Sequence, residues 1–186
     1  MMDTGLTYEE RRLQSIHFIK KLGRTLRELN NSELEKEIAN FLKKLQCLSL
    51  GTVNPDGTPH QTILDYVSDG LGIIIASEGG QKFINLERSN KVSITIGFTD
   101  GTIESEYGLT IDGTAEVYTA PHPRFLTGMM KMKSFLEEWS KAVQPLENVI
   151  KRVITARVMI VKPEKMTYMN LPAGVPFSRW EKSSAQ

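Results

Sequence analysis

Apolar residues recur every three or four positions from about residue 7 to residue 46, which is the period of an amphipathic helix. The first stripe contains Leu13, Ile16, Ile19, Leu22 and Leu26. Thr7, followed by two glutamates, is placed to cap a helix over this stripe. Polar residues 30–32 interrupt the pattern, and Ser32 followed by Glu35 predicts a capping box for a second helix. The apolar face of that helix contains Leu34, Ile38, Phe41, Leu42 and Leu45.

Strand-type patterns dominate residues 47–120. The run Asn54-Pro55-Asp56-Gly57 is a strong turn signal between two apolar segments, so it predicts a hairpin. Strands are expected at 48–53, 60–67, 72–77, 92–98 and 109–118, with a short helix at 81–89 that carries Phe83 and Leu86. Within the last of these strands, Gly113 is expected to form a bulge or a bend.

The last third of the chain mixes both patterns. A helix is expected from Arg124 to Ala142, followed by strands at 153–162 and 166–170 that Pro163 separates. The tail from residue 171 is rich in proline and reads as an irregular arm. The chain thus divides into an N-terminal helical extension (1–46), a central domain (47–170) with an inserted helix (122–142), and a C-terminal arm (171–186).

Composition narrows the class of protein without indicating its chemistry. The chain has 186 residues, 23 Lys and Arg against 22 Asp and Glu, and a formal charge of +1. This balance argues against a nucleic-acid partner, which requires a surplus of basic side chains. The N-terminus lacks the apolar run of a secretory signal, and no apolar stretch is long enough to span a bilayer. We therefore expect a cytoplasmic protein with no membrane partner.

The single cysteine, Cys47, excludes an internal disulfide. It lies where an apolar helix meets a strand, so we expect it to pack as a small hydrophobic residue rather than act as a nucleophile. The three histidines, His17, His60 and His122, show no metal-binding spacing, and no metal site is predicted. Neither a GxGxxG nor a GxxxxGK[ST] phosphate loop occurs.

One corner of the predicted structure suits an anion. The strand that ends at Ser77 leads through Gly79-Gly80 into a helix that begins with Gln81 and Lys82. The start of a helix offers unpaired N–H groups and the positive end of its dipole, where a cation such as Lys82 is poorly placed. A bound phosphate would remove that conflict, whereas the alternative is a solvated lysine beside a flexible glycine turn.

The run LSLGTVNPDGTPHQTILDYVSDGLGIIIASEGGQKFINLERSNKVSITI resembles the pyridoxamine 5′-phosphate oxidase-like flavin-binding split barrels. It shows in order a strand, a DGxPh-type turn, a second strand, a third strand ending in Ser, a glycine turn with Lys, and an NL segment before the next strand. The resemblance implies a mainly β fold with flanking helices: an antiparallel split β-barrel that forms a homodimer, with FMN at the dimer interface.

The same resemblance implies the cofactor-binding residues. The second strand would contact FMN through Gln61, Thr62, Ile63 and Leu64, while Ser77, Gln81 and Lys82 would hold its phosphate and ribityl chain. Thr62 stands where the oxidase proper has arginine, and Gln81 where it has a second basic residue, so this site is expected to be less cationic. Asn90 replaces the usual proline after the helix, which is a structural change.

The function implied is that of an FMN-dependent oxidoreductase with an unassigned small-molecule substrate or nicotinamide donor. The segment Ser178-Arg179-Trp180-Glu181 lacks the Arg-x-His arrangement of the oxidase proper, which argues against pyridoxamine phosphate as substrate. Packing of Trp180 and Phe177 within the arm is favoured over stacking on a partner's flavin. The alternatives are a non-catalytic flavin carrier or sensor, or a relative that binds deazaflavin or haem, with His60 or His122 as the axial ligand. No catalytic acid or base is singled out.

Overall fold

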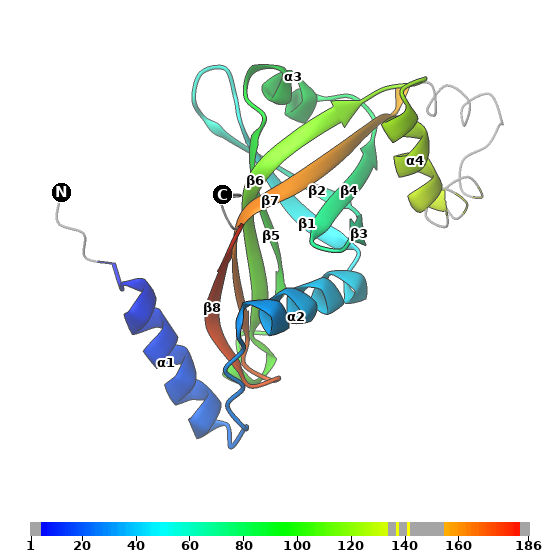
Figure 1. Ribbon diagram of the computed structural model, residues 1–186. Coiled ribbons are helices and arrows are strands. Elements are labelled where there is room, and N and C mark those ends of the chain that lie inside the picture. The colour runs from blue at the N-terminus through cyan, green and yellow to red at the C-terminus, as the bar shows by residue number, and fades with distance from the viewer. Residues whose placement is uncertain (1–4, 134–136, 138–140, 142–154, 183–186) are drawn as a thin grey trace.

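A computed structural model of the chain describes residues 5–133, 137, 141 and 155–182. Within them, eight antiparallel strands form one curled sheet, a half-barrel with helices on its flanks (Figure 1). The strands are β1 (Cys47–Val53), β2 (Pro59–Asp65), β3 (Val67–Asp69), β4 (Gly72–Ser77), β5 (Lys91–Phe98), β6 (Tyr107–Tyr118), β7 (Arg157–Asn170) and β8 (Val175–Glu181). The helices are α1 (Tyr8–Lys21), α2 (Asn31–Lys44), α3 (Gln81–Arg88) and α4 (Pro123–Lys131), with a 3-10 turn at Ile103–Ser105.

The strands follow the order β2-β1-β5-β6-β7-β4-β3, and β8 pairs with β7 beyond the end of β4. The edge strand β2 also contacts β4 across the curl, although the two strands are not hydrogen-bonded to each other. The predicted hairpin and the mainly β fold class are therefore confirmed. Within the described residues, no helix combines the length and the apolar character needed to cross a bilayer.

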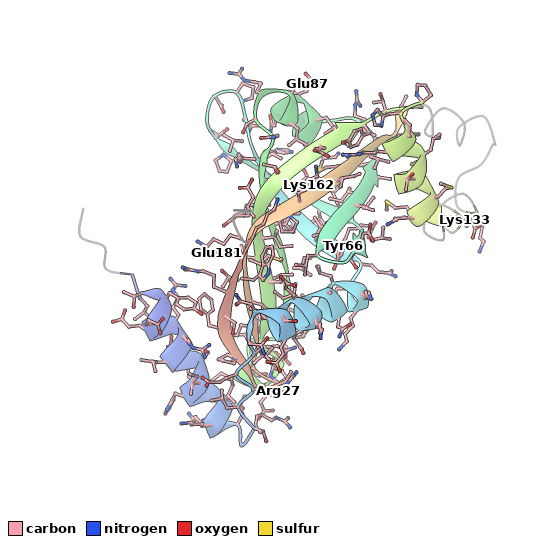
Figure 2. The ribbon with its side chains drawn as sticks, viewed as in Figure 1. Arg27, Tyr66, Glu87, Lys133, Lys162 and Glu181 are labelled. Carbon is pink, nitrogen blue, oxygen red and sulfur yellow. The ribbon has the colours of Figure 1, made fainter. Side chains whose placement is uncertain are left out.

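The main core fills the concave side of the sheet. Side chains alternate along β1, β5 and β6, so Leu50, Ile94 and Ile111 point inward and are 0% exposed. Helix α2 contributes Leu34, Ile38, Phe41 and Leu42 to this core, as its spacing predicts. Tyr66 lies between the sheet and α2 (Figure 2), where its hydroxyl donates to the carbonyl of Leu42 at 3.0 Å. Burial raises the pKa of that hydroxyl to about 12.

The helix starts are only partly as predicted. Thr7 caps α1 in a capping box with Glu10. Helix α2, however, is capped by Asn30 with Glu33, two residues before the predicted pair of Ser32 and Glu35, because Asn30 is the residue that adopts the extended cap conformation. The first stripe also ends early: Leu13 is 64% exposed and Leu26 lies beyond the end of α1.

The cap assignment predicts a stability difference between two neighbouring substitutions. Asn30→Ala should lower the free energy of unfolding by about 1 kcal/mol, because the amide of Glu33 loses its 3.0 Å bond to the Asn30 side chain. Ser32→Ala is the matched control and should have a smaller effect. Urea titrations of both variants measure this, and a larger loss for Ser32→Ala would contradict the cap at Asn30.

Pro163 does not divide the last strands. Strand β7 runs unbroken from Arg157 to Asn170, and Pro163 lies opposite Gly113 of β6, where the register shifts because β7 carries one extra residue, Glu164. A side chain on Gly113 would place its Cβ 2.4 Å from the carbonyl oxygen of Lys162, so glycine is required for this close approach. The bulge accommodates a proline that lacks an amide donor, which explains why the predicted break is absent.

The C-terminal segment is also more regular than predicted. Residues 175–181 form β8 rather than an irregular arm, because they pair with the part of β7 that β4 leaves free. Trp180 packs into the main core, 8% exposed, and its indole donates to Glu35 of α2 at 2.7 Å. The expectation that Trp180 packs within its own chain is confirmed. Helix α4 ends at Lys131, and most of the predicted helix beyond it lies outside the described residues.

Candidate functional site

The predicted anion corner lies where β4 ends and α3 begins. The turn from Glu78 to Gly80 connects them, and Gly80 adopts φ +130°, a conformation that favours glycine. Gly80 occupies the N-cap position without a side chain that could cap the helix. The first turn of α3 therefore relies on other groups to accept from its backbone amides.

Lys82 is buried at this corner, with 7% of its surface exposed. Its ammonium nitrogen lies over the ring of Phe83, 4.8 Å from the ring centroid. The same nitrogen donates to the carbonyls of Glu78 and Gly79, at 3.2 and 3.4 Å. The structure places Lys82 at the corner where the sequence predicts it. The alternative of a solvated lysine does not match the structure, because the side chain is buried.

A second cation, Arg157, reaches the same corner from β7. Arg157 pairs with Ser77 in the register of β4 and β7, and its guanidinium carbon lies 5.2 Å from the centroid of the Phe83 ring. A Cβ built on Gly79 would lie 3.1 Å from the Arg157 Nη1 atom, so the guanidinium closely approaches this turn. Arg157 therefore adds a positive charge to this corner that the local sequence around Lys82 does not reveal.

The two cations are close enough to affect each other. Burial, and then the like charge of Arg157, lower the pKa of Lys82 from its ordinary value, while the attraction of Glu78 partly opposes this shift. An anion at this corner would stabilise both positive charges and oppose the lowering of the Lys82 pKa. The hydroxyl of Ser77 is an additional donor here, and it now donates to the carbonyl of Glu78 at 3.2 Å.

Gln81 is the first residue of α3, and its side chain bonds to another residue of the same helix. Its side-chain amide donates to Asn85 at 2.9 Å, and the Asn85 amide donates in turn to Thr52 and Asn54, each at 3.0 Å. This chain of polar groups, in which Asn85 and Thr52 are buried, ties α3 to the β1–β2 hairpin. It fixes the orientation of the helix that carries Lys82.

The four candidate residues on β2 are divided between the two faces of an edge strand. Thr62 and Leu64 face inward; Leu64 packs against the main core, and the Thr62 hydroxyl lies 3.2 Å from the His60 ring. Gln61 and Ile63 face outward; Gln61 accepts from Ser49 at 2.8 Å, and Ile63 is 76% exposed. No single face of β2 therefore presents all four side chains.

Cys47 is exposed, which contradicts the expected packing. It occupies the first position of β1, where the alternation that turns Leu48 and Leu50 inward turns Cys47 outward. The described residues do not gather three or more His, Cys, Asp or Glu side chains in an arrangement that could hold a metal ion. His122 caps α4, accepting from the amide of Arg124 at 3.1 Å.

Comparisons with known proteins agree with this fold. The model of the pyridoxamine 5′-phosphate oxidase family matches residues 34–170, a range that includes most of α2 as well as the sheet up to the end of β7. No curated protein is significantly similar to the chain in sequence.

Several solved structures share the architecture at low sequence identity. A protein of the pyridoxinephosphate oxidase family from Clostridium acetobutylicum, related to general stress protein 26, is 15% identical, with 82% of this chain and 96% of that chain covered and a TM-score of 0.58. A haem-binding protein from Mycobacterium smegmatis is 14% identical (84% and 60% covered, TM-score 0.57). An FAD-binding protein from Mesorhizobium loti is 16% identical (72% and 91% covered, TM-score 0.55). At these identities the likeness establishes the split-barrel fold alone.

Proposed function

Because the chain belongs to the pyridoxamine 5′-phosphate oxidase family, we propose that it is an FMN-binding flavoprotein that acts as an oxidoreductase on a small molecule. The observation that carries this proposal is the convergence of Lys82 and Arg157 on the glycine turn before α3. Two cations that share one turn and one aromatic ring form a site for a dianion. The phosphate of FMN is such a group.

The residues present at the corner fit a phosphate. Lys82 supplies a compact charge and Arg157 a planar set of N–H donors, which together suit the terminal oxygens of a phosphate. The uncapped first turn of α3 adds backbone donors, and the Ser77 hydroxyl can turn from the Glu78 carbonyl toward an anion. Gln81 remains a proposed contact through its backbone or a rotated side chain.

The remaining proposed contacts lie along β2. The flavin would be flanked by Gln61, Thr62, Ile63 and Leu64. Their outer backbone groups would be available because β2 is an edge strand that, among the described strands, pairs with β1 alone. Bound FMN would supply the electron-transfer chemistry, with a nicotinamide nucleotide or another small molecule as donor. The protein's part is to hold the phosphate at the corner and to orient the ring along β2.

A homodimer belongs to this proposal. The outward Ile63 is 76% exposed on an edge strand, and such strands are usually covered in stable proteins. Pairing across a two-fold axis would cover this strand and close a flavin site between two copies.

The substrate is proposed to differ from pyridoxamine phosphate. The segment that lacks the Arg-x-His arrangement is β8, in which Trp180 is buried and Arg179 stacks on the ring of Tyr8 at 4.6 Å. These side chains are committed to packing against α2 and α1. They do not present the basic pair that the phosphate of that substrate would need.

Spectra of the purified protein test the proposal directly. Reconstitution with FMN should give a flavin absorption spectrum that bleaches when NADH or NADPH is added without oxygen and recovers with an electron acceptor. A bound flavin that neither nucleotide reduces would instead favour a carrier or sensor. A Soret band after incubation with haem, with no uptake of FMN, would contradict the proposal and favour a haem site near His60 or His122.

A further inference from the structure

A second pocket, of about 500 Å³, lies between α4, the first half of β4 and the middle of β7. It is separate from the phosphate corner, because neither Lys82 nor Arg157 lines it. The pocket opens along β7 between Val161, the last residue that pairs with β4, and Lys165, the first residue that pairs with β8. Its volume falls within the range of small-molecule sites.

Among the described residues, four cationic side chains line this pocket. They are Arg124 and Lys131 of α4, Lys162 of β7 and Lys182 beyond β8. Asp69, the one carboxylate among these described lining residues, is paired with Lys131. A second carboxylate, Glu116, bonds to Arg124 and Lys162 beside the pocket, so within this described set two negative charges face four positive ones.

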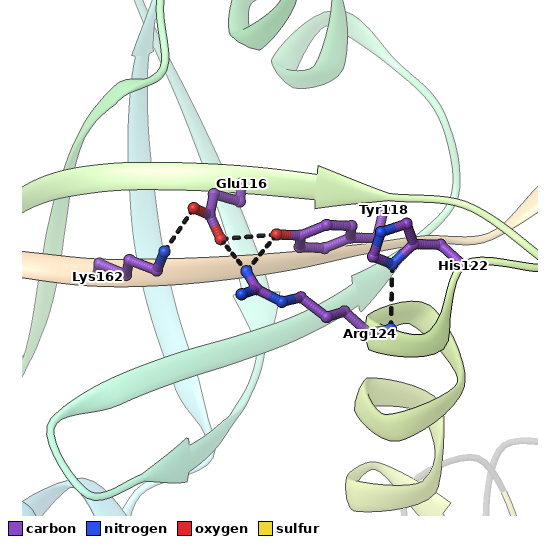
Figure 3. Close-up of polar contacts among 5 residues, drawn as sticks. All are labelled: Glu116, Tyr118, His122, Arg124 and Lys162. Atoms are coloured by element: carbon purple, nitrogen blue, oxygen red, sulfur yellow. Dashed lines mark hydrogen bonds and ion pairs between the residues drawn. The ribbon is translucent and has the colours of Figure 1, made fainter.

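Glu116 shows how two of these cations converge on one anionic group. Arg124 Nη1 lies 2.7 Å from one Glu116 oxygen, and Lys162 Nζ lies 2.5 Å from the other (Figure 3). Hydrogen bonds from Lys162 and Tyr118 lower the pKa of Glu116, so it stays ionised. The side chains of Arg124 and Lys162 are 53% and 49% exposed, so they can turn toward a ligand at small cost.

The rest of the lining is apolar. Ile74 and Ile160 belong to the cluster that packs α4 against the sheet, and Trp180 of the main core also lines the pocket. Helix α4 lies very close to β7, since a Cβ on Gly128 would be 2.5 Å from the Val158 side chain. The close packing fixes one wall of the pocket, while the charged side chains Arg124, Lys131 and Lys162 are partly exposed to solvent.

We propose that this pocket binds a small organic phosphate monoester. The dianionic head would accept from Arg124, Lys162 and Lys182, which matches the excess positive charge, and an apolar body would lie on Ile74, Ile160 and Trp180. This proposal does not depend on flavin binding. If the pocket did not bind a phosphate monoester, the proposed function would be unaffected.

Phenyl phosphate is the probe for this site. In a Trp139→Phe variant, Trp180 is the remaining tryptophan, and its fluorescence should change with a saturable Kd of about 0.1–1 mM. Lys162→Ala and Lys182→Ala should each weaken binding about three- to tenfold, and phenol should not bind. Lys91→Ala, in an exposed ion pair with Glu164, is the matched control and should have no effect.

Lys82→Met separates the two sites. It should leave phenyl phosphate binding unchanged, and a loss in this variant would overturn the proposal by placing the probe at the corner of α3. Equal affinity in the Lys162→Ala and Lys91→Ala variants, or no saturation below about 20 mM, would also overturn it. If Trp139→Phe does not fold, NMR shifts of the Thr127 and Gly128 amides on titration of the wild-type chain report the same binding, and their absence contradicts the proposal.

Discussion

Replacing Lys82 with methionine is expected to weaken FMN binding about ten- to a hundredfold, the loss of one charge-assisted contact to a phosphate. Methionine keeps an unbranched apolar side chain, so the change removes the ammonium group and its contact with the Phe83 ring while most of the buried volume stays filled. Because Lys82 is buried, water cannot readily replace the missing donor. Fluorescence titration of the apo-protein with FMN measures the dissociation constant.

Arg157→Met should have an effect of similar size, because the guanidinium reaches the same turn from β7. Lys91→Met provides the control for loss of one positive charge, since Lys91 is exposed and paired with Glu164. An unchanged dissociation constant for both Lys82→Met and Arg157→Met, with thermal stability like that of the wild type, would show that the phosphate of FMN does not bind at this corner.

Truncation of Trp180 to alanine is expected to lower the free energy of unfolding by about 3–5 kcal/mol, the usual cost of removing a large buried aromatic side chain. Trp180 is 8% exposed and belongs to the main core. Its indole also donates to Glu35, so the substitution breaks the link between β8 and α2. Chemical denaturation followed by circular dichroism measures the change.

Two further variants resolve the causes of that loss. Trp180→Phe keeps most of the buried surface and should cost less, chiefly the bond to Glu35 and some packing volume. Glu181→Ala, at the exposed next position of β8, should change stability little. A Trp180→Ala variant as stable as the wild type would mean that the C-terminal segment does not pack as β8, and that the prediction of an irregular arm was correct.

Local patterns predicted most of the fold because local physics determines those elements. The Asn54–Gly57 turn, the alternation along β1 and β5, and the apolar face of α2 all depend on neighbours in sequence. The errors arose where pairing partners decide the outcome. Pro163 is tolerated because Gly113 lies opposite it, and β8 exists because β4 leaves part of β7 free.

The candidate site likewise contains residues that local sequence predicts and one that only strand pairing brings into place. Ser77 and Lys82 are found at the corner that the glycine turn and the helix start predict. Arg157 could not be found this way, because only the register of β4 and β7 places it opposite Ser77. Cys47 was misjudged because its exposure depends on which face of β1 meets the core, and a shift of one residue reverses that choice.

The most direct measurement compares FMN with riboflavin on the wild-type apo-protein. The two ligands differ only in the phosphate that Lys82 and Arg157 are proposed to hold. We expect FMN to bind at least about a hundredfold more tightly, with the difference shrinking as ionic strength rises. Equal affinities for the two ligands, or binding of neither, would contradict the account.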